Sequence, residues 1–363
     1  MTAAPAAPAG RDGGPAAAVR LADHTTLRVG GPAGRFIVAR TEADLIGAVQ
    51  AADAAGQPLL VLGGGSNIVV ADAGFPGWVV RVAVRGRDSE AAPDGAVHVT
   101  AAAGEVWDDV AAWTLERGWA GLEALSGIPG TVGAAPVQNI GAYGAEAADV
   151  IVSVRAFDRA DGRVRTWPAA DCAFGYRTSR FKREPGRHVV LAVACRLRQA
   201  AQSAPVAYAE LADRLGVRLG ERAGAAAVRA AVLGLRRAKG MLLDPADHDT
   251  WSAGSFFTNP VLTPQQAAAL PAAAPRYPQP DGAVKTSAAW LIEQAGFAKG
   301  HGSGPARLSG RHVLALTNRG GATAADLLAL AAEVRAGVRA AYGVTLEPEP
   351  VLVGCALPAA GAD

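Results

Sequence analysis

Residues Leu122–Gly144 read LEALSGIPGTVGAAPVQNIGAYG, and this stretch decides the fold that we expect. Glycines stand at positions 127, 130, 133, 141 and 144, and Pro129 and Pro136 lie among them. Glycine and proline at this density are not tolerated inside a helix or a strand. The stretch therefore predicts an ordered loop system, or turns that lead into one short helix. A surface linker is the alternative, but the many Leu, Ile, Val and Tyr residues disfavour it.

A second glycine-rich stretch, Pro58–Val70, reads PLLVLGGGSNIVV. Its two apolar runs on either side of Gly63–Asn67 predict strand, loop and strand, and a plain hairpin loop is the alternative interpretation. Backbone N–H groups of two such loops can bind an anion such as a diphosphate. The patterns GxxxxGK[ST] and GxGxxG do not occur in the sequence, so neither a Walker loop nor a Rossmann fingerprint is present.

The composition narrows the class of protein. A chain of 363 residues with 50% hydrophobic residues is long enough for two or three domains. A net charge of +2 does not indicate a nucleic-acid partner. The three cysteines, Cys172, Cys195 and Cys355, have no metal-binding spacing and fit a reducing cytoplasm. No apolar run reaches membrane-spanning length, and residues 1–18 are expected to form a disordered tail.

Periodicity and capping signals predict the regular elements. Thr41 and Asp44 form a capping box for a helix over residues 41–55, with Leu45, Val49 and Ala52 on its buried face. Further helices are expected over residues 106–118, 220–240, 288–296 and 322–341. Strands are expected over residues 35–39, 79–84, 97–101, 150–158, 163–167, 189–197 and 345–353. Ala160-Asp161-Gly162 predicts a hairpin between the strands over 150–158 and 163–167, and Gly343 is expected to end the last helix. The arginines of the helix over 220–240 are expected on a solvated face, with a diphosphate contact as the alternative.

The two glycine-rich stretches, GGGSN and SGIPGTVGAAPVQNIGAYG, together with three later motifs resemble the UDP-N-acetylenolpyruvoylglucosamine reductases. The resemblance runs from about Thr25 to Gly354. It implies a flavoenzyme of peptidoglycan precursor synthesis that uses NADPH and holds FAD noncovalently. The implied fold is α+β, with a FAD-binding domain of the vanillyl-alcohol-oxidase (PCMH) type over residues 19–200 and a smaller α+β substrate-binding domain over 201–330. Residues 331–363 would supply a helix and a strand that complete the active site.

The resemblance assigns cofactor contacts to both loops. The residues implied to bind FAD are Gly63, Gly64, Gly65, Ser66, Asn67, Ile128, Pro129, Gly130, Gly133, Asn139, Gly141, Ala142, Tyr143 and Gly144. By the same resemblance Tyr208, Lys239 and Asn259 contact the UDP part of the substrate. Lys299 is a further cation for phosphate, whereas a lone histidine such as His312 is more often structural. No cluster of His, Cys, Asp and Glu has metal-ligand spacing.

Three residues are implied to carry the chemistry. Arg177, in the motif GYR…FK, would grip the substrate carboxylate and stabilise an enolate-like intermediate; a surface arginine is the alternative. Ser255, in GSFFTNP, would donate the proton to the carbanion; a capping serine is the alternative. Glu349, in LEPEP, would act with the arginine. Glu347 and Glu349 are expected on one face of a strand, where like charge raises the pKa of one carboxyl. This chain has Pro350-Val351 where relatives carry an apolar residue and an arginine.

Two other functions remain open on the sequence alone. An alcohol oxidase on the same flavin fold commonly tethers its flavin to a histidine near the first loop, but the nearest histidine downstream of Gly63 is His98. A silent sugar-nucleotide-binding module is disfavoured by the retained Arg177, Ser255 and Glu349. The sequence does not indicate an oligomeric state.

Overall fold

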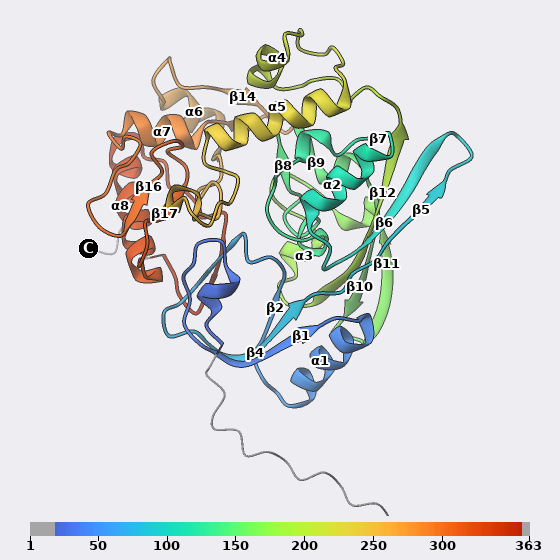
Figure 1. Ribbon diagram of the computed structural model, residues 1–363. Helices are drawn as coiled ribbons and strands as arrows, with labels where there is room; N and C mark the ends of the chain where they lie inside the picture. Colours follow the sequence, from blue (N-terminus) through green and yellow to red (C-terminus); the bar gives the residue numbers. More distant parts are fainter. Residues whose placement is uncertain (1–18, 358–363) are drawn as a thin grey trace, which may run out of the picture.

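The N-terminal region is built on a parallel sheet. The computed structural model describes residues 19–357 (Figure 1). Strands β1 (Ala33–Ala39) and β2 (Leu59–Leu62) lie on either side of β4 (Phe75–Val82). Helix α1 (Glu42–Ala54) packs against β1 and β4 and buries Leu45, Val49 and Ala52. The predicted capping box is confirmed, because Asp44 N donates to Thr41 Oγ1 at 3.1 Å and Thr41 N donates to Asp44 Oδ2 at 3.0 Å.

A larger antiparallel sheet stands beside it. In spatial order its strands are β11 (Arg163–Pro168), β10 (Ile151–Asp158), β12 (His188–Gln199), β6 (Ala96–Ala102) and β5 (Arg87–Ala91), and β7 (Trp119–Ala120) pairs with β12. The expected hairpin of β10 and β11 is confirmed. Strand β5 was not expected. Four of its five residues are exposed, so it has no alternation of apolar and polar side chains that could reveal it.

The first core forms where helix α2 (Trp107–Glu116) and the central loop meet this sheet. Trp107 is buried, and its indole N–H donates to the carbonyl of Leu125 at 3.0 Å. Leu122, Leu125 and Val132 pack into the same core as the strands β6, β10 and β12. The stretch over residues 122–144 is thus an ordered loop that is fixed by its apolar residues, as predicted.

The C-terminal half packs around a second core and a smaller cluster. Helices α4 (Ala209–Leu215) and α5 (Ala225–Ala238) pack against each other in the smaller cluster. The elements of the second core are β13 (Val261–Leu262), α6 (Pro264–Ala269), β14 (Tyr277–Pro278), β15 (Val284–Lys285), α7 (Ala288–Gln294), β16 (Ala306–Leu308), β17 (Leu316–Asn318) and α8 (Ala324–Tyr342). Phe256 and Phe257 enter this core beside residues of α7 and α8. Helix α5 runs between these helices and the region of α2 (Figure 1). None of the described helices is long and apolar enough to cross a membrane.

The end of the chain returns to the N-terminal region. Strand β18 (Val351–Val353) pairs in parallel with β3 (Ile68–Val70), which directly follows the Gly63–Asn67 loop. The hairpin interpretation of that loop is therefore wrong, because β2 and β3 belong to different sheets. The strand expected over residues 345–353 is also too long. Residues 345–350 contain one isolated bridge, between Pro348 and Phe257, because the two prolines lack the N–H groups of a regular ladder.

Two further expectations need correction. The domain boundary placed at residue 330 falls inside α8, which continues to Tyr342 and packs in the second core throughout. The helix α5 does not carry a purely solvated basic face, because Arg236 is buried and donates to the carbonyls of Gly127 and Met241 at 3.0 and 3.1 Å. The tail expected over residues 1–18 lies outside the described residues.

Candidate active site

The two glycine-rich loops lie directly against each other. Ser66 Oγ donates to the carbonyl of Pro129 at 2.9 Å. A Cβ on Gly64 would lie 2.8 Å from the Cα of Gly130, and a Cβ on Gly130 would lie 2.7 Å from Ser66 Oγ. Any larger side chain at either glycine would push the loops apart. The sequence placed both loops correctly, and their contact explains why both need glycine.

The first loop fits a bound anion. Its buried Gly65 adopts a φ of 62°, and its carbonyl accepts a hydrogen bond from Thr26 N at 3.0 Å. Within residues 19–357, the N–H groups of Gly64, Gly65 and Ser66 donate to no protein acceptor. Successive free N–H groups of this kind form a concave donor surface that suits a diphosphate. The donor set therefore fits the diphosphate of FAD.

The second loop is held by Asn139. Its side chain is fully used, because Nδ2 donates to Glu146 Oε2 at 2.7 Å and to the carbonyl of Gly175 at 3.2 Å, and Oδ1 accepts from Ala148 N at 2.9 Å. Asn139 is buried and adopts a φ of 46°. Its side-chain amide therefore shapes the loop, and the contact to FAD expected for Asn139 stays a prediction.

Arg177 and Glu349 meet at this loop. Arg177 donates from Nη2 to the carbonyl of Gly141 at 2.7 Å and from Nη1 to that of Asn139 at 3.4 Å. Its Nε lies 3.1 Å from Glu349 Oε1, an ion pair without the alignment of a hydrogen bond. Arg177 has a φ of 52°, and Lys182 Nζ of α3 (Arg180–Arg183) donates to its carbonyl at 3.0 Å. The guanidinium is thus fixed in place before any ligand arrives.

Glu349 is the most enclosed carboxyl of the site, with 12% of its side chain exposed. Burial raises the pKa of this carboxyl, although the charges of Arg177 and Lys182 act in the opposite direction. The raised pKa was expected, but its cause was wrong: it comes from burial and not from Glu347, which is exposed. Gln138 Nε2 also donates to Glu349 Oε1 at 3.3 Å.

Ser255 reaches the same place through backbone pairing. Glu349 N donates to the carbonyl of Phe256 at 2.8 Å, and Thr258 N donates to that of Glu347 at 3.0 Å. Because the two segments pair in antiparallel orientation, Ser255, one residue before Phe256, lies beside the residue that follows Glu349. Ser255 is half-buried, and its hydroxyl makes no hydrogen bond to the protein within the described range. A free hydroxyl of this kind is available to a substrate.

The residues expected to bind UDP divide into two groups. Tyr208, 41% exposed, packs edge-on against Tyr143 with ring centroids 5.5 Å apart. Lys239 Nζ lies 5.7 Å from the Tyr143 ring and forms an ion pair with Glu210. Asn259 lies elsewhere. Its N–H donates to the hydroxyl of Tyr176 at 3.3 Å, and its Oδ1 accepts from Ala288 N at the start of α7.

Sequence reasoning missed several contacts of the site. Asn67 was expected only as a FAD contact, but its Nδ2 donates to Gln138 Oε1 and to the carbonyl of Glu349, so it joins the first loop to the last segment of the chain. Lys182 was quoted within its motif without a role. His312 is half-buried near Lys239 and Lys299, and desolvation together with these charges lowers its pKa to about 4. The signal that could have revealed these residues is their position next to the motif residues.

Two family models match separate parts of this chain. Residues 33–167 match the family model of a FAD binding domain, so the chain belongs to the flavoproteins. Residues 244–353 match the C-terminal domain of UDP-N-acetylenolpyruvoylglucosamine reductase.

Relatives of that name cover nearly the whole chain. The protein from Saccharopolyspora erythraea is 56% identical over 360 residues, covering 96% of this chain and 98% of its own. The protein from Cutibacterium acnes is 54% identical over 342 residues, covering 93% and 90%. The crystal structure of the Thermus caldophilus reductase has a TM-score of 0.65 at 28% identity, covering 92% and 97%. The chain therefore belongs to the UDP-N-acetylenolpyruvoylglucosamine reductase family, flavin-dependent oxidoreductases that use FAD and NADPH.

The contact between the loops gives a first prediction. Gly64→Ala should weaken FAD binding, because its Cβ would meet the Gly130 backbone at 2.8 Å. Overpacking of this kind costs about 1–3 kcal/mol, or roughly 10- to 100-fold in affinity. Titration of the apoprotein with FAD measures the change. Gly47→Ala in α1 is the matched control, since nothing lies within 4 Å of its Cβ and FAD affinity should not change. Equal FAD affinity of Gly64→Ala and wild type would contradict the assigned contact.

The buried carboxyl gives a second prediction. Because its pKa is raised in the folded protein, the stability that Glu349 contributes is present below its unfolded pKa and is lost as pH rises through the folded value. Glu349→Gln should therefore be more stable than wild type at pH 7, and the gain should vanish toward about pH 4. Urea unfolding with saturating FAD between pH 4 and 8 measures this difference. A variant that is less stable at pH 7 would show that the ion pair with Arg177 outweighs burial.

Proposed function

We propose that the chain reduces the enolpyruvyl ether of UDP-N-acetylglucosamine enolpyruvate to UDP-N-acetylmuramate, with NADPH as the electron source. The observation that carries this proposal is the pairing of Phe256 with Glu349. This pairing sets a free serine hydroxyl and a fixed Arg177–Glu349 pair beside the loops that fit FAD. An acid, a cation and a flavin at one place are what the reduction of an alkene next to a carboxylate needs.

Each group has a separate task in this proposal. When bound, reduced FAD supplies the hydride to the far carbon of the alkene. Arg177 binds the substrate carboxylate and stabilises the negative charge that develops on the neighbouring carbon; its own hydrogen bonds to Gly141 and Asn139 hold it there. Ser255 donates the proton that this carbon takes up. Glu349, with its raised pKa, orients the guanidinium and limits the net positive charge.

The sugar nucleotide would be held at the other end of the site. Lys239 would exchange its ion pair with Glu210 for a phosphate of the substrate, and the exposed Tyr208 would close over the diphosphate. Asn259 would contact the substrate near Tyr176 through the amide N–H₂ that its bond to Ala288 leaves free. NADPH would reduce the flavin and leave before the enolpyruvyl substrate enters. Because both reactants are cytoplasmic metabolites, we infer that the chain acts in the cytoplasm.

Flavin content and turnover test this function. The purified protein should be yellow, acid precipitation should release the chromophore as free FAD, and NADPH should be consumed only with the enolpyruvyl sugar nucleotide. Oxygen consumption with an alcohol would indicate an oxidase instead. A colourless protein that binds the sugar nucleotide without turnover would indicate a binding module.

Lys239→Ala should raise the KM for the sugar nucleotide more than it lowers kcat. The reason is that a phosphate far from the reacting carbon makes the same contact in the ground state and the transition state. Steady-state kinetics at saturating NADPH measure both constants, and Lys285→Ala, a lysine that stacks on Tyr176, provides a comparison at the other end of the site. A large loss of kcat at unchanged KM would assign Lys239 to the chemical step.

Ser255→Ala should separate the two half-reactions. FAD binding and flavin reduction by NADPH should stay near normal, because neither needs a proton on the substrate carbon. Reoxidation by the enolpyruvyl sugar should slow by at least ~10²-fold, the lower range for loss of a general acid. Ser255→Cys should recover part of the rate, since a thiol is a stronger acid of similar size. Stopped-flow measurement decides the matter: slow reduction with intact reoxidation would remove Ser255 from the proton-transfer step.

A further inference from the structure

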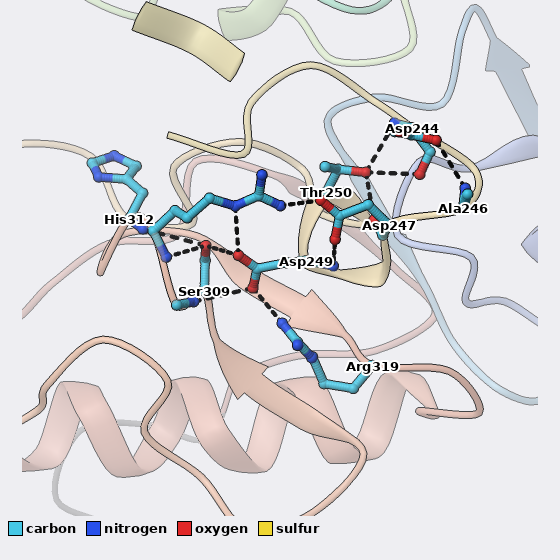
Figure 2. A network of polar contacts seen from close by, with 10 residues as sticks. Asp244, Ala246, Asp247, Asp249, Thr250, Ser309, His312 and Arg319 are labelled. Atoms are coloured by element: carbon cyan, nitrogen blue, oxygen red, sulfur yellow. Dashed lines mark hydrogen bonds and ion pairs between the residues drawn. The ribbon is translucent and has the colours of Figure 1, made fainter. Parts of the chain in front are cut away.

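A buried carboxylate outside the reacting centre gathers an unusual number of donors. Asp249 lies in a short turn, His248–Thr250, and 8% of its side chain is exposed. Its Oδ2 accepts from Ser309 Oγ at 2.9 Å and from Arg311 Nε at 3.0 Å, and its Oδ1 accepts from Gly310 N at 3.0 Å and from Arg319 (Figure 2). No step of the proposed reaction uses this carboxylate, so its contacts need another explanation.

The donors belong to the turn that carries His312. Ser309 Oγ, which donates to Asp249, accepts in turn from Arg311 N at 3.0 Å and from His312 N at 3.2 Å. The backbone of this turn is therefore set by a chain of hydrogen bonds that starts at Asp249. Figure 2 shows His312 at the far end of this turn, pointing away from the carboxylate. His312 is half-buried, and its ring lies close enough to Lys239 and Lys299 for their charges to lower its pKa.

The same network touches the residue next to Lys239. Gly240 has a φ of 67°, and a Cβ there would lie 3.1 Å from Arg311 Nε and 3.3 Å from the carbonyl of Asp249. The end of α5, which Lys239 caps, thus lies close against the Arg311 side chain and the backbone of Asp249. The carboxylate consequently fixes the His312 turn and binds the arginine that lies against the residue after Lys239, so it links two segments of the group formed by Lys239, Lys299 and the neutral His312.

Charge balance explains why an ionised aspartate is needed there. Arg311 and Arg319 both face Asp249, and Asp247 is the second anion, paired with Arg311. Two cations and two anions compensate each other within this cluster. A neutral side chain at residue 249 would leave one partly buried guanidinium without its partner, and removing one partner of a buried pair is strongly unfavourable. The turn would then lose its fixed geometry.

We propose that Asp249 is a positioning residue for the substrate diphosphate: it holds the Lys239 backbone and the His312 turn in the relative placement that phosphate binding requires. The inference rests on the proposed function, because it takes the group of Lys239, Lys299 and His312 as the phosphate end of the site. Asp249 does not touch the substrate. It acts through the segments that it joins.

Asp249→Asn tests the proposal, because asparagine keeps the shape of the side chain and removes its charge. The KM for the enolpyruvyl sugar nucleotide should rise by at least ~10-fold, while kcat changes less than ~3-fold and FAD content stays normal, as expected for uniform binding. The dissociation constant of UDP, measured by calorimetry on the FAD-loaded enzyme, should rise by a similar factor. An unchanged KM and an unchanged UDP affinity would overturn the proposal.

Asp158→Asn is the matched control. Asp158 is an equally buried carboxylate that accepts from Arg187 at 2.8 and 2.9 Å and from Ala160 N at 3.0 Å, in the hairpin of the large sheet. Asp158→Asn should lower the free energy of unfolding and leave the KM for the sugar nucleotide and the affinity for UDP unchanged. Equal increases of KM in both variants would show that Asp249 acts through general destabilisation, which also overturns the proposal.

Ser309→Ala keeps the test decisive if Asp249→Asn does not fold. It removes the hydroxyl between Asp249 and the His312 turn while the ion pairs remain, and it should raise the KM in the same direction by a smaller factor. A wild-type KM in this variant would overturn the proposal. Failure of the proposed function is a separate result, because the wild-type enzyme itself would then not oxidise NADPH with the enolpyruvyl sugar nucleotide.

Discussion

The hydrogen bond from Glu349 N to the carbonyl of Phe256, together with the parallel pair of β18 and β3, is the constraint on which the site depends. Ser255, Arg177 and Glu349 come from three separate segments of the chain, and no local rule of secondary structure brings them together. β18 draws the last segment onto the strand that follows the first glycine-rich loop. The bond to Phe256 then brings the serine segment against it. The active site is thus a product of strand pairing between segments that lie far apart in the sequence.

Backbone strain is concentrated at the same place. Five residues other than glycine have positive φ in the described part of the chain, and three of them, Asn139, Tyr143 and Arg177, lie in or against the second loop. Each such conformation costs about 1–2 kcal/mol. They persist because hydrogen bonds on several sides determine them, such as those from Lys182 to the Arg177 carbonyl and around the Asn139 amide. This cost is compensated by a guanidinium that needs no reorganisation when charge develops near it.

Local signals in the sequence predicted local structure well, and the site only in part. The capping box at Thr41, the hairpin around residues 160–162 and the glycine that ends α8 all depend on neighbouring residues, so the sequence reveals them. The partner of β3, the burial of Arg236 and the surroundings that bury Glu349 depend on segments more than a hundred residues away. The motif residues became a site only through the family resemblance, because a single Gly-Ser turn or charged loop has many ordinary uses.

The phosphate end and the flavin end of the site share one residue of the backbone. Gly127 N donates to Asp108 Oδ1 of α2 at 2.6 Å, and the Gly127 carbonyl accepts from Arg236 of α5 at 3.0 Å. Asp108 also binds Arg229, so α5 is attached to α2 on both sides of this glycine. Lys239 caps the C-terminal end of α5, so this helix connects the lysine to the second glycine-rich loop. Under the proposed function, substrate and flavin would therefore be aligned without a hinge, because the helix that ends at the proposed phosphate contact is bonded to the loop expected to bind FAD.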